Sequence, residues 1–396
     1  MSYLTQLFVV LRLHVRTFPR RIKSALVIAL SLVPVVGFLL AILSLGEGMR
    51  LACLGAGDAH IAIVLSAGAI TGAEVVVRGV DGTSSLAPAL ISHIEGASGI
   101  RRLPDGSPLA DAQVALFQGG LTKVNGGTGF TNLRGIGVHG LALMPHFRLL
   151  SGRSIRPNSN DLMVGGTAQG KFSGLKLGDR ITLEGNTWSV VGVFSTSSFD
   201  DGDLLVSSQR LLDLLPLPRY SSVLVGLQAP GGFNTFRRDV LQTQALPVSV
   251  ERLSDYWAHL YATIPSTAFI IAYVISALVA AGALAGIIHL MHAAVDARAA
   301  EIAVLRAIGF SGVPVAASVV IEALVLACLG AAIATLIDRL WLEGYAYNGA
   351  FGVFRAAVTF RLFFVGAAWA VVVAFIGALL PSIRAATTPV MEALGA

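Results

Sequence analysis

The sequence predicts a membrane protein built from four transmembrane helices and one large α+β domain outside the membrane. The chain has 396 residues, of which 55% are hydrophobic and only 13% are charged, whereas soluble proteins contain about 25% charged residues. Four apolar stretches are each long enough to cross a bilayer as a helix, which takes about 20 residues. A long polar stretch separates the first apolar stretch from the other three.

The predicted order along the chain is therefore one span, a large domain and three more spans. The net charge of +5 is small for this length, and the basic residues gather beside the spans, so nucleic-acid binding is not expected. The predicted segments are residues 1–23 (N-terminal helix), 24–46 (first span), 47–264 (outside domain), 265–292 (second span), 293–312 (charged link), 313–337 (third span), 338–361 (outside loop), 362–384 (fourth span) and 385–396 (tail).

The N-terminal segment is expected to form an amphipathic helix in the inner membrane interface. It contains five basic residues and no acidic one, and its apolar residues recur on one helical stripe. A basic tail that only sets the topology is a compatible alternative. The basic residues are Arg12, Arg16, Arg20, Arg21 and Lys23, and the stripe is Leu4, Leu7, Phe8, Leu11 and Val15.

The large domain is predicted to be a split βαβ layer of the porter-like type with a small β-rich insertion. Two strand–helix–strand units frame the insertion, which spans about residues 125–213. Seven glycines between Gly119 and Gly137 indicate a mobile loop or a hairpin. The first unit is Glu74–Val80, Ser84–Ile94 and Ala112–Phe117, the second is Ser222–Gln228, Phe233–Leu241 and Val248–Val250, and the strands of the insertion include Leu162–Val164, Arg180–Leu183 and Trp188–Phe194.

The spans differ in what interrupts them. A secretory signal peptide is an alternative for the first span, but the apolar run is too long and lacks a clear cleavage site. The third span is interrupted only by Glu322. Ionisable groups inside a span are costly and usually have a role. Glu322 either makes a pairing or hinge contact inside the bundle or reaches out to water at the interface.

Basic residues in short loops predict the orientation. The N-terminal segment contains five, the link of residues 296–312 contains two, and the tail contributes Arg384, against three in the loop of residues 338–361. This distribution places both termini and the link in the cytoplasm and the large domain outside.

The charged link reads DARAAEIAVLRAIGFSG, from Asp296 to Gly312. Gly309 suits the left-handed end of a helix. Ser311 is a favoured N-cap residue for a new helix, with Pro314 in the first turn of that helix. The pattern therefore predicts a helix, a break and a second helix. Such a link either receives a soluble partner or only keeps two spans apart.

The sequence contains no complete enzyme motif. The stretch from Gly165 to Lys171 matches the start of a P-loop, but Phe172 stands where Ser or Thr would bind magnesium, and a turn and strand follow. The histidines are scattered, and the two cysteines, Cys53 and Cys328, form neither a zinc site nor a disulfide framework. An ATPase, if one is needed, is expected to be a separate chain.

Several segments resemble the MacB/FtsX-type ABC transporter permeases. They are EIAVLRAIGFSG in the link, IEALVLACLG in the third span, LMPHFRLLSGRSI and DLMVGGTAQGKFSGLKLGDRITLEGNTWSVVGVF in the outside domain, and PSIRAATTPVMEAL near the C-terminus. The resemblance covers nearly the whole chain, and the order of the segments matches. The link departs from the family in having few basic residues after Gly309.

The resemblance implies that the link is a coupling helix that docks on a cytoplasmic ABC ATPase. That partner would bind the ATP and magnesium, so no cofactor is expected on this chain. The resemblance assigns the coupling to Asp296, Arg298, Glu301, Ile302, Leu305, Arg306 and Gly309, and it marks Glu322 as an intramembrane position.

The family also implies a homodimer in the bacterial inner membrane, surrounded by lipid, with a periplasmic domain, a periplasmic adaptor and an outer-membrane channel. The expected function is mechanotransmission, in which ATP-driven motion moves the periplasmic domain and exports a substrate from the periplasm. An FtsX-like subunit that activates a periplasmic hydrolase and a lipoprotein-releasing permease are the alternatives.

Overall fold

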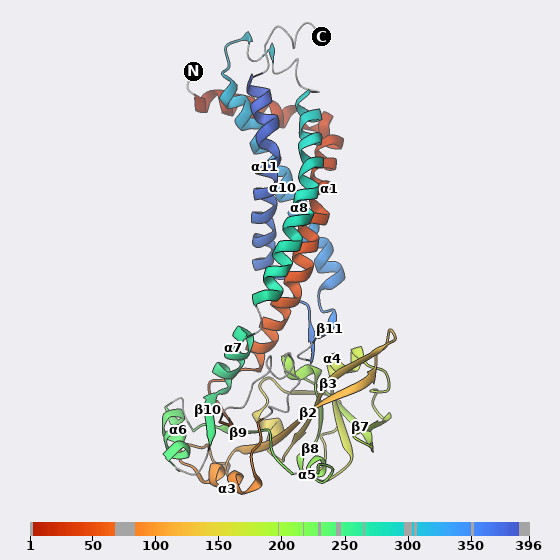
Figure 1. Cartoon of the computed structure of the whole chain (residues 1–396), viewed down its shortest axis with the longest axis vertical. Helices are drawn as coiled ribbons and strands as arrows, with labels where there is room; N and C mark the ends of the chain where they lie inside the picture. The colour runs from red at the N-terminus through yellow and green to blue at the C-terminus, as the bar shows by residue number, and fades with distance from the viewer. Residues whose placement is uncertain are drawn as a thin grey trace. The chain divides into compact units, whose positions relative to one another are not determined.

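The computed structural model in Figure 1 contains two compact units. We call residues 1–47, 267–343 and 357–396 the helical unit, and residues 48–266 and 344–356 the sheet unit. The structure describes residues 3–67, 84–196, 198–216, 218–228, 231–242, 247–263, 266–296, 303–304, 307–349 and 352–387.

The helical unit contains four long helices that lie side by side in Figure 1. Each includes a stretch that is long and apolar enough to span a membrane, so the predicted four transmembrane helices are confirmed. The helices are α1 (Tyr3–Ala56), α8 (Ser266–Asp296), α10 (Gly312–Leu342) and α11 (Phe360–Thr387), and the apolar stretches are Ala25–Ala56, Tyr273–Ala293, Gly312–Leu342 and Phe360–Arg384.

Small residues let these helices approach closely. A Cβ atom added to Gly330 of α10 would lie only 2.6 Å from the carbonyl oxygen of Ala29 in α1. Leu32 of α1 and Ala327 of α10 are fully buried in the same cluster. Because lipid tails are as apolar as leucine, close packing of this kind replaces the hydrophobic effect as the source of helix association.

Three helix boundaries differ from the sequence prediction, one of them the end of α1, which continues past residue 46 to Ala56. The N-terminal segment is helical from Tyr3 and continues without a break into the first span. Helix α10 continues past Ile337 to Leu342, since no helix breaker occurs before Gly344, which has a left-handed φ of 73°. Asp338, expected in the outside loop, is therefore a buried acid within a long helix, just before its last turn.

The first layer of the sheet unit is built from two strand–helix–strand units. The strand order is β10-β1-β9-β2, and neighbouring strands are antiparallel. This is the order of a split βαβ fold, so that prediction is confirmed. The elements are β1 (Ile61–Ser66), α3 (Pro88–Gly96) and β2 (Ala110–Thr122), followed after the insertion by β9 (Ser222–Gly226), α6 (Gly232–Gln242) and β10 (Val248–Arg252).

The two helices pack on the apolar face of this layer. Ile94 of α3 and Phe236 of α6 are fully buried in one cluster with Val64 of β1 and Val225 of β9. Strand β1 is absent from the sequence prediction, because a short apolar run without alternation fits a helix as well as a strand. The predicted strand Glu74–Val80 lies outside the described residues.

The insertion extends the same sheet, which has ten strands among the described residues. Beyond β2 the order is β3-β8-β5-β7-β4, and β6 pairs with β7. Trp188 and Phe172 are buried at the centre of its core. The elements are β3 (Thr128–Ile136), β4 (Arg148–Gly152), β5 (Asp161–Gly165), α4 (Gly166–Lys171), β6 (Arg180–Leu183), β7 (Asn186–Ser195), β8 (Leu204–Ser207) and α5 (Ser208–Leu212), with 3-10 turns η1 (Gly140–Leu143) and η2 (Phe199–Gly202).

The glycine-rich stretch forms a hairpin of β2 and β3, so the hairpin alternative of the prediction is confirmed. A register shift between Gln118 and Leu121 marks an irregularity in the pairing. Gly120, Gly126 and Gly127 have φ values of 76°, 88° and 77°, which other residues rarely adopt. The glycines therefore shape this hairpin and its turn.

Candidate functional site

The ends of the predicted coupling link are held by other parts of the helical unit. The amide of Ser311 donates to Oε1 of Gln6 at 3.1 Å, and a Cβ atom on Gly312 would lie 2.7 Å from the carbonyl oxygen of Ala386. Asp296 Oδ1 lies 3.8 Å from Arg384 Nη2. Both of these charges are more than half exposed, so the ion pair contributes little stability.

Two of the seven predicted coupling residues are described, Asp296 and Gly309. Gly309 has a φ of 101°, the left-handed conformation predicted for the end of a helix. Val304 and Ile308, one helical turn apart, are 49% and 71% exposed. The other five coupling residues lie outside the described residues; they are Arg298, Glu301, Ile302, Leu305 and Arg306.

Two acids lie within the third span. Glu322 is half-buried on α10 and interacts with another group. Its role as a pairing or hinge contact stays a prediction. Asp338 is 7% exposed, lies beside Gly37 of α1, and its Oδ2 has no hydrogen-bond partner among the described residues. The sequence reasoning missed Asp338 because it ended the span at Ile337, whereas the helix continues to Leu342.

A second candidate site lies in the sheet unit, in a loop that we call the junction loop, residues 198–203. Its three aspartates, Asp200, Asp201 and Asp203, are each at most 6% exposed. Burying carboxylates is costly unless they are paired and hydrogen-bonded. The partners of these three acids therefore show what the loop is built to hold.

Asp200 and Asp203 share one cation. Nη2 of Arg134 on β3 lies 2.8 Å from Asp200 Oδ1 and 2.6 Å from Asp203 Oδ2. Asn132 Nδ2 donates to the other oxygen of Asp203 at 3.2 Å. Burial and the neighbouring Asp200 raise the pKa of Asp203, although Arg134 opposes the shift. A cluster with two acids on one buried guanidinium fixes the position of the loop on β3.

Asp201 connects the loop to a second hairpin. Its Oδ1 accepts from the amide of Thr196 at 3.0 Å, and its Oδ2 accepts from the hydroxyl of Thr167 at 2.8 Å. The same hydroxyl accepts from Nε of Arg355 at 2.9 Å. Arg355 belongs to the hairpin of β11 (Ala346–Gly349) and β12 (Gly352–Arg355).

This hairpin is part of the sheet unit's core, although the sequence between α10 and α11 encodes it. Val353 is 1% exposed and packs in the same cluster as Trp188. A Cβ atom on Gly202 of the junction loop would lie 2.5 Å from the carbonyl oxygen of Val353. Lys171 Nζ donates to the carbonyl oxygen of Ala346 at 2.7 Å. The lysine of the P-loop-like stretch is therefore used to hold the hairpin.

Two helical segments complete this junction. The ring of Trp257 on α7 (Leu253–Thr263) lies 5.4 Å from the ring of Phe199 in the junction loop. Gly48, in the part of α1 that belongs to the sheet unit, packs against the backbone of Arg355. The hairpin and α7 therefore contact the junction loop directly, and residues 48–56 of α1 reach it through Arg355 of the hairpin.

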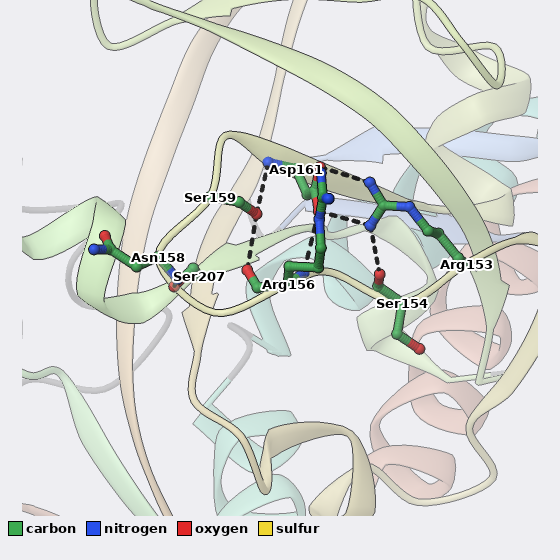
Figure 2. Close-up of polar contacts among 7 residues, drawn as sticks. All are labelled: Arg153, Ser154, Arg156, Asn158, Ser159, Asp161 and Ser207. Atoms are coloured by element: carbon green, nitrogen blue, oxygen red, sulfur yellow. Dashed lines mark hydrogen bonds and ion pairs between the residues drawn. The ribbon is translucent and has the colours of Figure 1, made fainter.

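Figure 2 shows a separate polar cluster at the start of β5, centred on the buried Asp161. Arg153 donates to both of its carboxylate oxygens, at 2.7 and 2.9 Å, and the amide and Nε of Arg156 each donate at 3.1 Å. The hydrogen bonds from Arg153 hold the pKa of Asp161 well below its ordinary value. This carboxylate orients two arginines at the surface.

Two family models match the chain. One is described as the MacB-like periplasmic core domain and matches residues 25–241, more than half of the chain. The other is described as the FtsX-like permease C-terminal domain and matches residues 273–390. The chain belongs to the MacB/FtsX-type ABC transporter permeases. The resemblance noted in the sequence is confirmed.

Solved structures of such permeases show low similarity to this chain. The periplasmic region of MacB from Actinobacillus actinomycetemcomitans is 15% identical, covering 55% of this chain and 98% of its own, with a TM-score of 0.38. The extracellular domain of YknZ from Gram-positive bacteria is 13% identical, covering 48% and 100%, with a TM-score of 0.36. A domain of a putative permease from Porphyromonas gingivalis is 14% identical, covering 49% and 89%, with a TM-score of 0.28.

No curated protein matches the chain. The assignment to the MacB/FtsX-type permeases therefore rests on the two family models. It makes the chain a membrane-spanning permease subunit of an ABC transporter, which works with a cytoplasmic ABC ATPase in the bacterial inner membrane.

Proposed function

We propose that this permease converts ATP-driven motion of a separate cytoplasmic ATPase into motion of its sheet unit in the periplasm, and so exports a substrate from the periplasm. The observation that carries the proposal is that three segments reach the junction loop, two by direct contact and the third through the hairpin. These segments are residues 48–56 of α1, helix α7 and the hairpin of β11 and β12. Each continues along the chain into the helical unit.

The contacts at the junction are suited to transmitting force. The hairpin is joined to the loop through Asp201, Thr167 and Arg355, and the loop is joined to the central sheet through Arg134. Partly satisfied buried polar networks are unstable, so a network of this kind favours one arrangement over intermediate ones. Displacement of any entering segment is therefore passed to the sheet.

At the other end of the path, the coupling link is where the ATPase would bind. Ser311 and Gly312 hold the link to the N-terminal helix and to the end of α11. Val304 and Ile308 offer exposed apolar surface on one face of its helix. The proposed partners are two ATPases that bind ATP and magnesium, a second copy of this permease, a periplasmic adaptor and an outer-membrane channel.

Co-purification with the ATPase of the same transporter tests the cytoplasmic half of the proposal. Leu305→Asp and Glu301→Lys are expected to remove the ATPase from the purified complex, because the first puts a charge at an apolar position of the docking helix and the second reverses the sign of a charge on it. Leu241→Asp changes an exposed leucine of the sheet unit and serves as the control. If the ATPase stays bound to both link variants, the assignment of the link is wrong.

A further inference from the structure

Strand β4 is an open edge of the ten-stranded sheet. It is the last strand in the sheet order and pairs with β7 alone among the described strands. All five of its residues, Arg148–Gly152, are exposed. Edge strands of this kind present unpaired backbone donors and acceptors, and they are sites where another chain can add a strand.

Three leucine side chains expose apolar surface to solvent at this edge. Leu149, Leu150 and Leu177 are 41%, 60% and 50% exposed, and Leu177 packs beside Gly152 at the end of β4. The register between β4 and β7 shifts between Leu149 and Ser151, so Leu150 is the extra residue. A bulge of this kind re-aims a side chain, and Leu150 is the most exposed of the three leucines.

Basic residues flank these leucines. Arg148 begins the strand and Arg153 follows it directly. Asp161 fixes Arg153 and Arg156, whose side chains converge on it in Figure 2. Arg156 uses its Nε for Asp161 and is 70% exposed, so the outer edge of its guanidinium is presented to solvent. An oriented guanidinium is well matched to a carboxylate.

This charge pattern disfavours a second copy of the chain on the same edge. Antiparallel pairing of two β4 strands about a two-fold axis between Leu150 and Ser151 would place Arg148 of one copy directly opposite Arg153 of the other. Like charges directly across a strand pair are destabilising. The edge is therefore complementary to a different molecule, one with apolar residues between acidic ones.

We propose that β4 is a docking edge for an extended segment of another protein, in which apolar residues are flanked by Asp or Glu. The backbone of the segment would pair along β4, its apolar side chains would cover Leu149 and Leu150, and its acids would meet Arg148, Arg153 and Arg156. This interface is independent of the ATPase and of the junction loop.

Fluorescence anisotropy with two labelled peptides tests the proposal on the full chain in lipid nanodiscs. Each peptide is about eight residues long, within the usual range of strand lengths, and alternates valine with threonine. One has glutamates at both ends and the other has lysines. The glutamate peptide is expected to bind at least about tenfold more tightly, and added salt should reduce the difference.

Leu150→Asp and Arg148→Glu are expected to weaken binding of the glutamate peptide by about tenfold, because each places a negative charge on the edge. The matched controls are Leu241→Asp and Arg238→Glu, on the exposed side of α6, which should bind like the wild type. Neither edge residue pairs with Asp161, so the arginine cluster stays intact.

Three results would overturn the proposal. Equal binding of the two peptides would show that charge does not select the occupant. Absence of binding by either peptide would mean that the edge arginines only prevent association. A disulfide formed between two copies through Leu150→Cys, in a Cys328→Ser background, would assign the edge to a second copy of the chain.

Discussion

Thr167 lies between the junction loop and the hairpin, and its hydroxyl makes one hydrogen bond to each of them. It donates to Asp201 and accepts from Arg355. Thr167 is itself 2% exposed, so water cannot easily replace either bond. A single hydroxyl in this position decides whether a buried carboxylate and a guanidinium are satisfied.

Thr167→Val is expected to destabilise the protein by about 1–3 kcal/mol, because it keeps the shape of the side chain and removes a hydrogen bond from the buried carboxylate of Asp201. Thermal unfolding of the purified protein measures the loss. Thr182→Val, on an exposed position of β6, is the control and should change stability by less than about 0.5 kcal/mol. An equal effect of the two variants would contradict the assigned role.

Asp111 on β2 gives the sheet unit a dependence on pH. It is 3% exposed and accepts from the amide of Gly137 at 3.2 Å. Burial raises the pKa of Asp111 to about 6, from an ordinary value of 3.8. The folded state therefore binds this proton more tightly than the unfolded state does, and the contribution of Asp111 to stability is lost as the pH rises from about 4 through 6.

The variant Asp111→Asn lacks this titration. Relative to the variant, the wild type is expected to lose stability between pH 3 and pH 7, by an amount that approaches about 3 kcal/mol. Melting temperatures of both proteins across this range give the difference, and contributions from other acids cancel in it. A difference that stays constant with pH would contradict the assigned cause.

At the scale of elements, the hairpin of β11 and β12 decides how the sheet unit is assembled. It lies between α10 and α11 in the sequence, yet Val353 is buried in the core around Trp188. Gly202 permits the approach, since any side chain there would meet the carbonyl oxygen of Val353. The hairpin is therefore a fixed part of the domain and a direct connection from the third and fourth spans.

Gly202→Ala is expected to destabilise the protein by about 1–3 kcal/mol through overpacking, and to reduce export further by displacing the hairpin. Gly170→Ala on α4 is the matched control, because its added methyl group meets nothing within 4 Å. Unfolding temperature and ATP-dependent export of a substrate are the two measurements. Normal stability and export in Gly202→Ala would show that the close contact is not needed.

Some elements are predictable from the sequence and others are not, for physical reasons. The strands at residues 161–165 and 180–183 are found because their apolar pattern and turn residues are local signals, as is Gly309 at the end of a helix. Strand β1 is missed because six mostly apolar residues have no period that separates strand from helix.

The junction loop could not be assembled from the sequence, because its partners are far apart in the chain. Arg134, Thr167 and Arg355 come from three different elements and share no motif spacing. The one local signal was the run FDDGD, in which three aspartates stand between Phe199 and Leu204. Acids enclosed by apolar residues indicate burial with partners, but they do not say which partners.

At the scale of the whole molecule, the chain passes between its two units four times, near residues 47, 266, 343 and 356. Helix α7 and the hairpin contact the junction loop, and α1 contacts the hairpin. The aspartates of the loop are held by Arg134 and Thr167. In the proposed mechanism, the ATPase moves the coupling link, the spans move with it, and the loop delivers this displacement to the sheet. This mechanism predicts that the distance between the sheet unit and the helical unit changes when ATP binds.

The most direct test is the distance between a spin label on α6, at Leu241→Cys, and one on α10, at Leu340→Cys, measured by double electron–electron resonance in a Cys328→Ser background. Both positions are exposed. We predict that the distance distribution shifts when ATP binds to the assembled transporter, and that Thr167→Val reduces the shift while the ATPase stays bound. An unchanged distribution in a transporter that hydrolyses ATP would contradict the account.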